Sequence, residues 1–219
     1  MANINTVLFD FDGTIMDTNS IIIESWQHTF RAIEGKERPV EEIIKTLGEP
    51  LATTLKNLFP GADTAEHISV YRNFHRANYE SNINIFPGVK ELLISLKEKG
   101  YKTGLVTSRL VWSTMLGLEK YEIKEYFDVV ITADDTDKHK PDPAPIYAAL
   151  EKLGSKAEES IFVGDTRFDI MCAANAGVKS VLVAWTIALP EEERTGENAP
   201  DHTIETAGEL LQVLEKYYA

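Results

Sequence analysis

The sequence predicts a doubly wound α/β fold, in which a parallel sheet lies between two layers of helices and a helical domain is inserted near the amino terminus. Three observations support this prediction. Short apolar runs alternate with amphipathic segments through the second half of the chain. One similar apolar run comes early, and a long stretch of helical periodicity separates it from the others. The 219 residues suffice for one core of this kind and a smaller accessory lobe.

The first strand is expected at Thr6–Asp10, a short apolar and β-branched run of the kind found in buried strands. From about residue 19 to residue 82, apolar side chains recur at helical spacing, and turns with glycine and proline divide them into separate helices. The repeating positions are Ile22, Ile23, Trp26, Phe30 and Ile33, then Ile43, Ile44 and Leu47, then Leu51, Leu55 and Leu58, followed by a helix from Ile68 to Tyr79. We therefore expect a helical cap over residues 17–85, inserted into a core made of residues 1–16 and 86–219.

After Pro87-Gly88 helices and strands alternate to the end of the chain. Strands are expected at 103–107, 129–132, 161–163 and 180–183, and helices at 89–99, 111–118, 143–153, 169–176 and 207–217. Gly100 and Gly177 directly follow two of these helices, which is a common way for a helix to end. Ligands of such sheets bind beyond the carboxyl ends of the strands, so functional residues are expected there.

The charge balance limits the partners of this protein. Lysine and arginine number 22 against 35 aspartate and glutamate residues, which gives a formal net charge of −13. Because such a surface repels phosphate backbones, we expect no nucleic-acid partner. No apolar run is long enough to span a bilayer, the amino terminus lacks the plan of a signal peptide, and Cys172 is the single cysteine. A cytoplasmic protein without a membrane partner or an internal disulfide is therefore expected.

Asp10 and Asp12 follow the first predicted strand, with Gly13 and Thr14 directly after them. Residues two apart in extended chain point the same way, so both carboxylates can face one site. Gly13 allows a tight turn whose N–H groups can face an anion. A calcium loop begins similarly, but it has glutamate at its twelfth position, where this chain has Ile21. The alternative that remains is a turn stabilised by aspartate side chains.

Two further polar clusters follow later strands. Thr107, Ser108 and Arg109 come after the second predicted strand, where hydroxyl and N–H groups can either hydrogen-bond phosphate oxygens or begin the next helix. Lys140 lies in a loop that neighbouring prolines stiffen. It is either a fixed cation of a site or a solvated surface lysine, as most lysines are.

Asp165 and Asp169 form the fourth cluster, after the strand predicted at 161–163. Two carboxylates four residues apart across a strand-to-helix turn suit a hard, oxygen-seeking cation such as Mg²⁺. Asp169 can also cap the amino terminus of the following helix. Each cluster alone is weak, and their joint position at the carboxyl ends of strands in one sheet is what indicates a single site. Cys172 lies in an apolar helix and is expected to be a packing residue rather than a nucleophile.

This order of clusters resembles the haloacid dehalogenase-like superfamily of phosphohydrolases. The matching elements are Asp10-x-Asp12-Gly-Thr14, Thr107, Lys140-Pro and Gly164-Asp165-x-x-x-Asp169, and with the helical block they span nearly the whole chain. The resemblance implies that Asp10 attacks phosphorus to form an aspartyl-phosphate, and that Asp12 is the general acid and base. Relatives often have asparagine or threonine and then lysine where this chain has Ser108 and Arg109.

The same resemblance implies the ligands of the site. A Mg²⁺ ion would be held by Asp10, the backbone carbonyl of Asp12, Asp165 and Asp169, where Asp169 either binds the ion or orients a bound water. Thr107, Ser108 and Lys140 would hold the phosphoryl oxygens. Mg²⁺ and the lysine together would offset carboxylates that otherwise repel an anionic substrate. A small anionic phosphorylated substrate is therefore the expected partner.

Within the superfamily, several stretches resemble bacterial pyrophosphatases of the PpaX type, and phosphoglycolate phosphatases are also similar. The stretches are Asp17-Thr-Asn19, Ile23-Glu-Ser25, His28-Thr-Phe30, Tyr71-Arg72, Glu125-Tyr-Phe-Asp-Val-Val130 and Trp185-Thr186. They imply hydrolysis of pyrophosphate or a small phosphomonoester. Arg72, His75 and Arg76 share one predicted cap helix, where they either contact an anionic leaving group or form a solvated face.

Two other functions are considered. A sugar-phosphate mutase of the β-phosphoglucomutase kind shares the core, but its cap usually carries a Lys-Gly-x-Ser-Arg element, where this chain has Thr46-Leu-Gly-Glu-Pro50. A non-catalytic binding module is disfavoured because the aspartates of the first cluster, the lysine and the acidic pair are all present.

Overall fold

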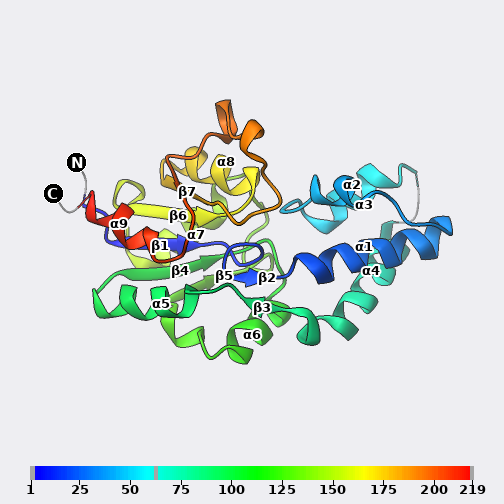
Figure 1. Cartoon of the computed structure of the whole chain (residues 1–219), viewed down its shortest axis with the longest axis horizontal. Coiled ribbons are helices and arrows are strands. Elements are labelled where there is room, and N and C mark those ends of the chain that lie inside the picture. The colour runs from blue at the N-terminus through cyan, green and yellow to red at the C-terminus, as the bar shows by residue number, and fades with distance from the viewer. Residues whose placement is uncertain (1–2, 62–63, 218–219) are drawn as a thin grey trace.

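The computed structural model describes residues 3–61 and 64–217 of the chain (Figure 1). Within these residues six strands form one parallel sheet, in the order β5-β4-β1-β6-β7-β8. Their bounds are β1 Thr6–Phe9, β4 Lys102–Val106, β5 Val129–Ile131, β6 Ser160–Gly164, β7 Lys179–Val183 and β8 His202–Ile204. The earliest strand of the chain thus lies inside the sheet, and the predicted α/β class with a parallel sheet is confirmed.

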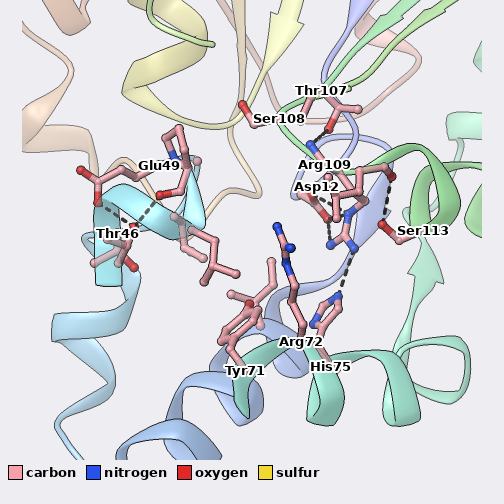
Figure 2. A pocket seen from close by; sticks show the side chains of 18 of the residues that line it. Asp12, Thr46, Glu49, Tyr71, Arg72, His75, Thr107, Ser108, Arg109 and Ser113 are labelled. Atoms are coloured by element: carbon pink, nitrogen blue, oxygen red, sulfur yellow. Dashed lines mark hydrogen bonds and ion pairs between the residues drawn. The ribbon is translucent and has the colours of Figure 1, made fainter. Parts of the chain in front are cut away.

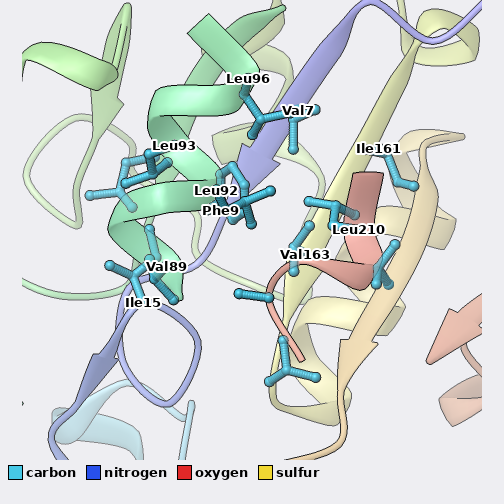
Figure 3. Packing of buried hydrophobic residues seen from close by; sticks show 14 of the residues in the cluster. Val7, Phe9, Ile15, Val89, Leu92, Leu93, Leu96, Ile161, Val163 and Leu210 are labelled. Carbon is cyan, nitrogen blue, oxygen red and sulfur yellow. The ribbon is translucent and has the colours of Figure 1, made fainter. Parts of the chain in front are cut away.

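Helices cover both faces of the sheet, because successive side chains of a strand point to opposite sides. On one face Val7 and Phe9 belong to a buried cluster with residues of α5 (Val89–Glu98) and α9 (Glu209–Glu215). Figure 3 shows Leu92 and Leu96 of α5 beside Phe9 and Val7. Burying such side chains is the main source of stability for this layer.

The opposite face is covered by α7 (Ala144–Leu153) and α8 (Arg167–Ala176). Leu8 and Phe162, which point away from the first cluster, pack there with apolar residues of both helices. Cys172 on α8 is fully buried in this cluster, as predicted for a packing residue. Its Sγ donates a hydrogen bond to a backbone carbonyl at 3.2 Å.

Four helices form a second lobe beside the sheet (Figure 1). They are α1 Asn19–Glu34, α2 Val40–Ile44, α3 Leu51–Leu58 and α4 Thr64–Asn78. The lobe has its own apolar core, in which the Trp26 ring lies 5.9 Å from Phe30 and 4.9 Å from Tyr71. Among the helices of the described residues, none is long and apolar enough to cross a lipid bilayer.

The helical lobe joins the sheet lobe through two short strands. β2 (Met16–Asp17) and β3 (Asn84–Ile85) pair antiparallel, so the chain enters and leaves the helical lobe side by side. Next to them Ile21 and Tyr79 are fully buried in a small cluster that includes partly buried residues of α6 (Val111–Lys120). The two lobes are therefore in contact beside their two connections.

The elements that the sequence did not predict are short. β2 and β3 have two residues each, too few for an alternating pattern, and β8 at the sheet edge has a polar sequence. Single turns of 3-10 helix also occur at Glu80–Asn82, Lys124–Tyr126, Ala157–Glu159, Glu191–Glu193 and Gly196–Asn198. The longer elements agree in type with the prediction and differ at their ends, as α8 does by beginning at Arg167 instead of residue 169.

Gly104 offers a test of how tightly the sheet is packed. A Cβ atom at this position of β4 would lie 2.7 Å from Leu8 Cδ2 and 3.0 Å from Val129 Cγ1. We expect Gly104→Ala to lower the free energy of unfolding by about 1–3 kcal/mol, the usual cost of overpacking a core. Gly208→Ala is the matched control, because nothing lies within 4 Å of a Cβ there and its φ is −63°. Urea denaturation measures the free energy of unfolding of both variants. Equal values would contradict tight packing around Gly104.

Candidate active site

The predicted polar clusters meet at the carboxyl edge of the sheet. Asp10 directly follows β1, Thr107 follows β4 and Asp165 follows β6. Because β1 pairs with β4 on one side and with β6 on the other, these three residues lie side by side. Lys140 comes from the loop after β5. The topology thus brings together residues that are up to 155 positions apart in the chain.

Lys140 lies between two carboxylates. Its Nζ is 2.7 Å from Asp10 Oδ1 and 2.6 Å from Asp169 Oδ1. Only 3% of Lys140 is exposed, so it is not a solvated surface lysine. Burial by itself lowers the pKa of a lysine, but Asp10 and Asp169 outweigh burial and hold the pKa of Lys140 above its usual range. This residue is therefore a fixed positive charge.

Asp165 uses only one of its two carboxylate oxygens in hydrogen bonds with the described residues. Its Oδ1 is buried and has no hydrogen-bond partner among the described residues, whereas Oδ2 accepts a hydrogen bond from Thr186 Oγ1 at 3.1 Å. One oxygen each of Asp10, Asp165 and Asp169 lies within 4.8 Å of the others. Three buried carboxylates against one lysine leave an excess of negative charge that a cation would offset. This all-oxygen set fits a hard divalent ion.

The pKa values reflect this crowding. Burial, followed by the charges of Asp169 and Asp10, raises the pKa of Asp165 well above its usual range. Burial also raises the pKa of Asp10, to about 7, although the positive charge of Lys140 works in the opposite direction. Both shifts arise first from burial, and the neighbouring carboxylates add to them.

Asp169 is engaged at both oxygens. Oδ1 pairs with Lys140, while Oδ2 accepts hydrogen bonds from the N–H of Thr166 at 2.9 Å and from its Oγ1 at 2.7 Å. Thr166 is the N-cap of α8 and accepts a hydrogen bond from Asp169 N in return, so the two residues form a capping box. Asp169 therefore stabilises the start of α8 and belongs to the acidic cluster as well.

Gly13 makes the close approach to Asp165 possible. A Cβ atom on Gly13 would lie 2.1 Å from Asp165 Oδ2, and its φ of +70° is in the left-handed region that favours glycine. The backbone is held there by Trp185, whose Nε1 donates a hydrogen bond to Gly13 O at 3.1 Å. The loop after β1 thus packs directly on the acidic cluster.

The carboxylate of Asp12 points to a different partner, Arg109. Arg109 Nε lies 2.9 Å from Asp12 Oδ2, and Nη2 lies 2.6 Å from Oδ1. Thr18 Oγ1 donates a further hydrogen bond to Oδ1 at 2.6 Å. Burial alone would raise the pKa of Asp12, but Arg109 and then Thr18 reverse this effect, so the pKa lies below its usual value. Asp10 and Asp12, two residues apart, therefore have opposite pKa shifts.

Thr107 and Ser108 lie on the loop between β4 and α6, and both line a pocket. Thr107 Oγ1 accepts a hydrogen bond from the N–H of Arg109 at 3.1 Å, which shapes the turn. Ser108 Oγ is buried and lacks a hydrogen-bond partner among the residues that the structure describes. Its hydroxyl group thus has unused hydrogen-bonding capacity beside the pocket.

The pocket has a volume of about 650 Å³ and lies between the helical lobe and the carboxyl edge of the sheet. Asp10, Lys140 and Asp165 line it from the sheet side. From the other side Arg72 extends from α4 into the pocket (Figure 2). No hydrogen bond or ion pair joins Arg72 to any residue of the described ranges. Its charge is therefore free to meet an anion.

The other two basic residues predicted on this helix are differently placed. The guanidinium of Arg76 lies over the Trp112 ring at 5.1 Å. His75 is buried, and its Nε2 lies 3.1 Å from Arg109 Nη1. Burial and then Arg109 lower the pKa of His75 to about 3, so its ring is neutral near pH 7. All three line the pocket, but His75 brings no positive charge to it.

Several side chains that hold the site in shape have no role predicted from the sequence. These are Thr18, Arg109, Thr166, Trp185 and Thr186. The role of Thr166 could have been predicted, because a threonine three residues before an acidic side chain is the pattern of a capping box. Arg109 was named as part of the polar cluster after the second predicted strand and as a departure from its relatives, without a partner of its own. For Thr18 and Thr186 the sequence carries no such signal.

The chain is similar to known proteins over nearly its whole length. The chain is 38% identical over 212 residues to the pyrophosphatase PpaX of Anoxybacillus flavithermus, covering 97% of each protein. It is 36% identical to the pyrophosphatase PpaX of Halalkalibacterium halodurans, over 96% of this chain and 97% of that protein. A solved haloacid dehalogenase-like hydrolase from Streptococcus pneumoniae superposes with a TM-score of 0.86 at 22% identity, covering 97% of this chain and 99% of the other. The family described as haloacid dehalogenase-like hydrolase matches residues 7–183, and the chain belongs to this family.

Proposed function

We propose that this protein is a Mg²⁺-dependent phosphatase that hydrolyses pyrophosphate or a small phosphomonoester through an aspartyl-phosphate on Asp10. The observation that carries the proposal is the buried cluster of Asp10, Asp165 and Asp169, in which Asp10 and Asp169 pair with Lys140. Its position at the inner wall of the pocket lets a bound phosphoryl group reach Asp10. The similarity to pyrophosphatases PpaX supports pyrophosphate as the substrate.

The residues that would hold Mg²⁺ are Asp10, Asp165 and the backbone carbonyl of Asp12. Asp169 would orient these ligands. The unpartnered Oδ1 of Asp165 supports this assignment. Asp169 has both oxygens engaged by protein groups, which favours an orienting role over direct ligation. A bound Mg²⁺ would supply positive charge that screens the carboxylates from an anionic substrate.

In the first step an oxygen of Asp10 bonds to phosphorus as the bond from phosphorus to the leaving oxygen breaks. Lys140, 2.7 Å from Asp10 Oδ1, orients this carboxylate and offers a charge to the transferred group. The Thr107 and Ser108 hydroxyl groups hold its other oxygens. Ser108 Oγ suits this task because no other described residue uses it.

In the second step a water molecule attacks the aspartyl-phosphate, and Asp12 takes its proton. This restores the free carboxylate of Asp10. When the substrate is an ester, Asp12 also gives a proton to the leaving oxygen in the first step. The lowered pKa of Asp12 keeps its carboxylate ionised near pH 7, which is the state that can accept the proton of water.

We further propose that residues 17–85 act as a cap that selects the leaving group, over a core of residues 1–16 and 86–219. The pairing of β2 with β3 supports this division, since the connections to the helical lobe lie there. Arg72 would contact the leaving group, because its charge is unpaired and faces the pocket. A leaving phosphate or small carboxylate would be favoured over a bulky neutral sugar.

The nucleophile is tested by Asp10→Asn. An amide cannot form the aspartyl-phosphate, so we expect no phosphate release from pyrophosphate and no trapped phosphoprotein. Asp12→Asn should slow turnover by roughly 10²–10⁴-fold, the usual contribution of general acid–base catalysis. Thermal unfolding checks that both variants are folded. Full activity in a folded Asp10→Asn protein would refute the mechanism.

The metal site is tested by Asp165→Asn. Loss of one carboxylate charge should weaken Mg²⁺ binding, measured by calorimetry, and raise the Mg²⁺ concentration needed for turnover. Mg²⁺ at about 100 times its Kd should stabilise the wild-type protein by about 2.7 kcal/mol, and the variant less at the same concentration. Ca²⁺ should bind without supporting hydrolysis. Undiminished hydrolysis in excess chelator would rule out this site.

The cap is tested by Arg72→Gln. Losing a charge-assisted contact should lower kcat/KM for pyrophosphate by about tenfold and leave p-nitrophenyl phosphate almost unchanged. Arg76→Gln should lower kcat/KM for pyrophosphate less, because the Arg76 guanidinium already lies over the Trp112 ring. If Arg72→Gln lowers kcat/KM equally for both substrates, the substitution has disturbed the folding of the cap instead of a contact with the leaving group.

A panel of phosphorylated compounds, assayed by phosphate release, tests the choice of substrate. Strong preference for hexose phosphates, or their isomerisation, would contradict the pyrophosphatase proposal and leave the Asp10 chemistry intact.

A further inference from the structure

Arg109 contacts both lobes of the molecule at the edge of the pocket. It follows β4 in the sheet lobe, and its side chain is 8% exposed. Nε and Nη2 form a two-pronged contact with the carboxylate of Asp12, while Nη1 lies 3.1 Å from Nε2 of His75 on α4 (Figure 2). One guanidinium group thus joins the proposed acid–base residue to a helix of the cap.

The direction of these hydrogen bonds defines the state of His75. A guanidinium group only donates, so His75 Nε2 must accept and Nδ1 must carry the ring proton. Nδ1 lies 3.2 Å from Ser25 Oγ, which donates to Ile21 O at 2.6 Å. A second ring proton would place an N–H group of His75 against an N–H group of Arg109, and it would add a positive charge beside the guanidinium. The contact therefore requires a neutral imidazole.

Aromatic rings restrict the movement of this group. Cζ of Arg109 lies 4.6 Å from the centre of the Tyr79 ring and 5.9 Å from that of Phe11. The His75 ring lies 5.7 Å from Tyr71 and 5.2 Å from Tyr79. Planar guanidinium groups can stack and form a two-pronged contact at once, which a lysine cannot do. A shift of α4 against the sheet lobe must therefore move Arg109 or break its contact with His75.

We propose that Arg109 is a positioning residue that transmits the position of the cap to Asp12. With His75 against Arg109, the Asp12 carboxylate has a fixed orientation for proton transfer, and without this contact the orientation is lost. The inference rests on the acid–base role proposed for Asp12. Both oxygens of Asp12 are in contact with Arg109, so a displacement of Arg109 changes how the Asp12 carboxylate is held.

The step that depends most on this arrangement is breakdown of the aspartyl-phosphate. There the oxygen of water bonds to phosphorus, the bond from phosphorus to Asp10 breaks, and Asp12 takes the proton of the water. Formation of the intermediate from pyrophosphate depends less on Asp12, because phosphate is a stable leaving anion. A misplaced Asp12 should therefore cause phosphorylated protein to accumulate.

The first test replaces Arg109. In Arg109→Met we expect kcat for pyrophosphate to fall at least about tenfold while KM changes less than about threefold, with more phosphoprotein trapped in the steady state. Arg109→Lys keeps the charge but cannot contact Asp12 and His75 in the same way, so it should stay impaired. A raised KM with unchanged kcat, or full activity in the lysine variant, would overturn the inference.

The second test asks whether His75 acts through Arg109. His75→Phe keeps a ring beside Tyr79 but removes the nitrogen that accepts the hydrogen bond from Arg109, so kcat should fall. If His75 acts through Arg109, the double variant should have the same kcat as Arg109→Met alone. His67→Phe is the matched control, since His67 is also a buried histidine on α4 and its ring packs 4.8 Å from Phe59. It should leave kcat unchanged. Additive losses of His75→Phe and Arg109→Met would contradict the link.

A measurement without substrate separates this inference from the proposed function. ¹⁵N NMR of the His75 ring should show the Nδ1–H tautomer in the wild-type protein and an altered Nε2 signal in Arg109→Met. If the wild-type protein hydrolyses neither pyrophosphate nor p-nitrophenyl phosphate, the proposed function fails, and the NMR result still decides whether Arg109 holds His75. An unchanged ring spectrum in the variant would overturn the inference.

Discussion

The burial of three carboxylates around one ammonium group is the constraint on which the rest of the site depends. Asp10, Asp165, Asp169 and Lys140 are each less than 5% exposed. Charges buried in this way are costly unless they are paired and hydrogen-bonded, and removing one partner of such a pair costs about 3–5 kcal/mol. The surrounding chain therefore supplies hydroxyl groups, a helix start and a glycine at contact distance. A parallel sheet makes this possible, because its strands all end at one edge.

The positive charges around the pocket differ in how fully the protein uses them. Lys140 pairs with two carboxylates, Arg109 with one, and Arg72 with none among the described residues. In a protein of net charge −13, the pocket has the guanidinium of Arg72 on the side of the helical lobe and the acidic cluster on the side of the sheet. Both lobes therefore contribute charged side chains to its lining.

Much of the fold and the grouping of the candidate site residues could be predicted because their signals are local. An apolar run followed by aspartate marks Asp10 and Asp165, and the rule that parallel strands end at one edge places them together. Arg109 could not be assigned in this way, since its partners Asp12 and His75 are 97 and 34 residues away along the chain. Nothing near an arginine in the sequence reveals which distant carboxylate it contacts.

The sequence by itself determined the α/β class, the inserted helical block and the acidic strand ends, because periodicity, turns and capping depend on residues a few positions apart. Only the tertiary structure decided which charges are satisfied within the protein. It showed His75 to be neutral, Asp12 to be paired with Arg109, and Oδ1 of Asp165 to lack a partner among the described residues. Protonation and pairing depend on burial and on distances between segments remote in the chain, and these exist only once the two lobes have packed together.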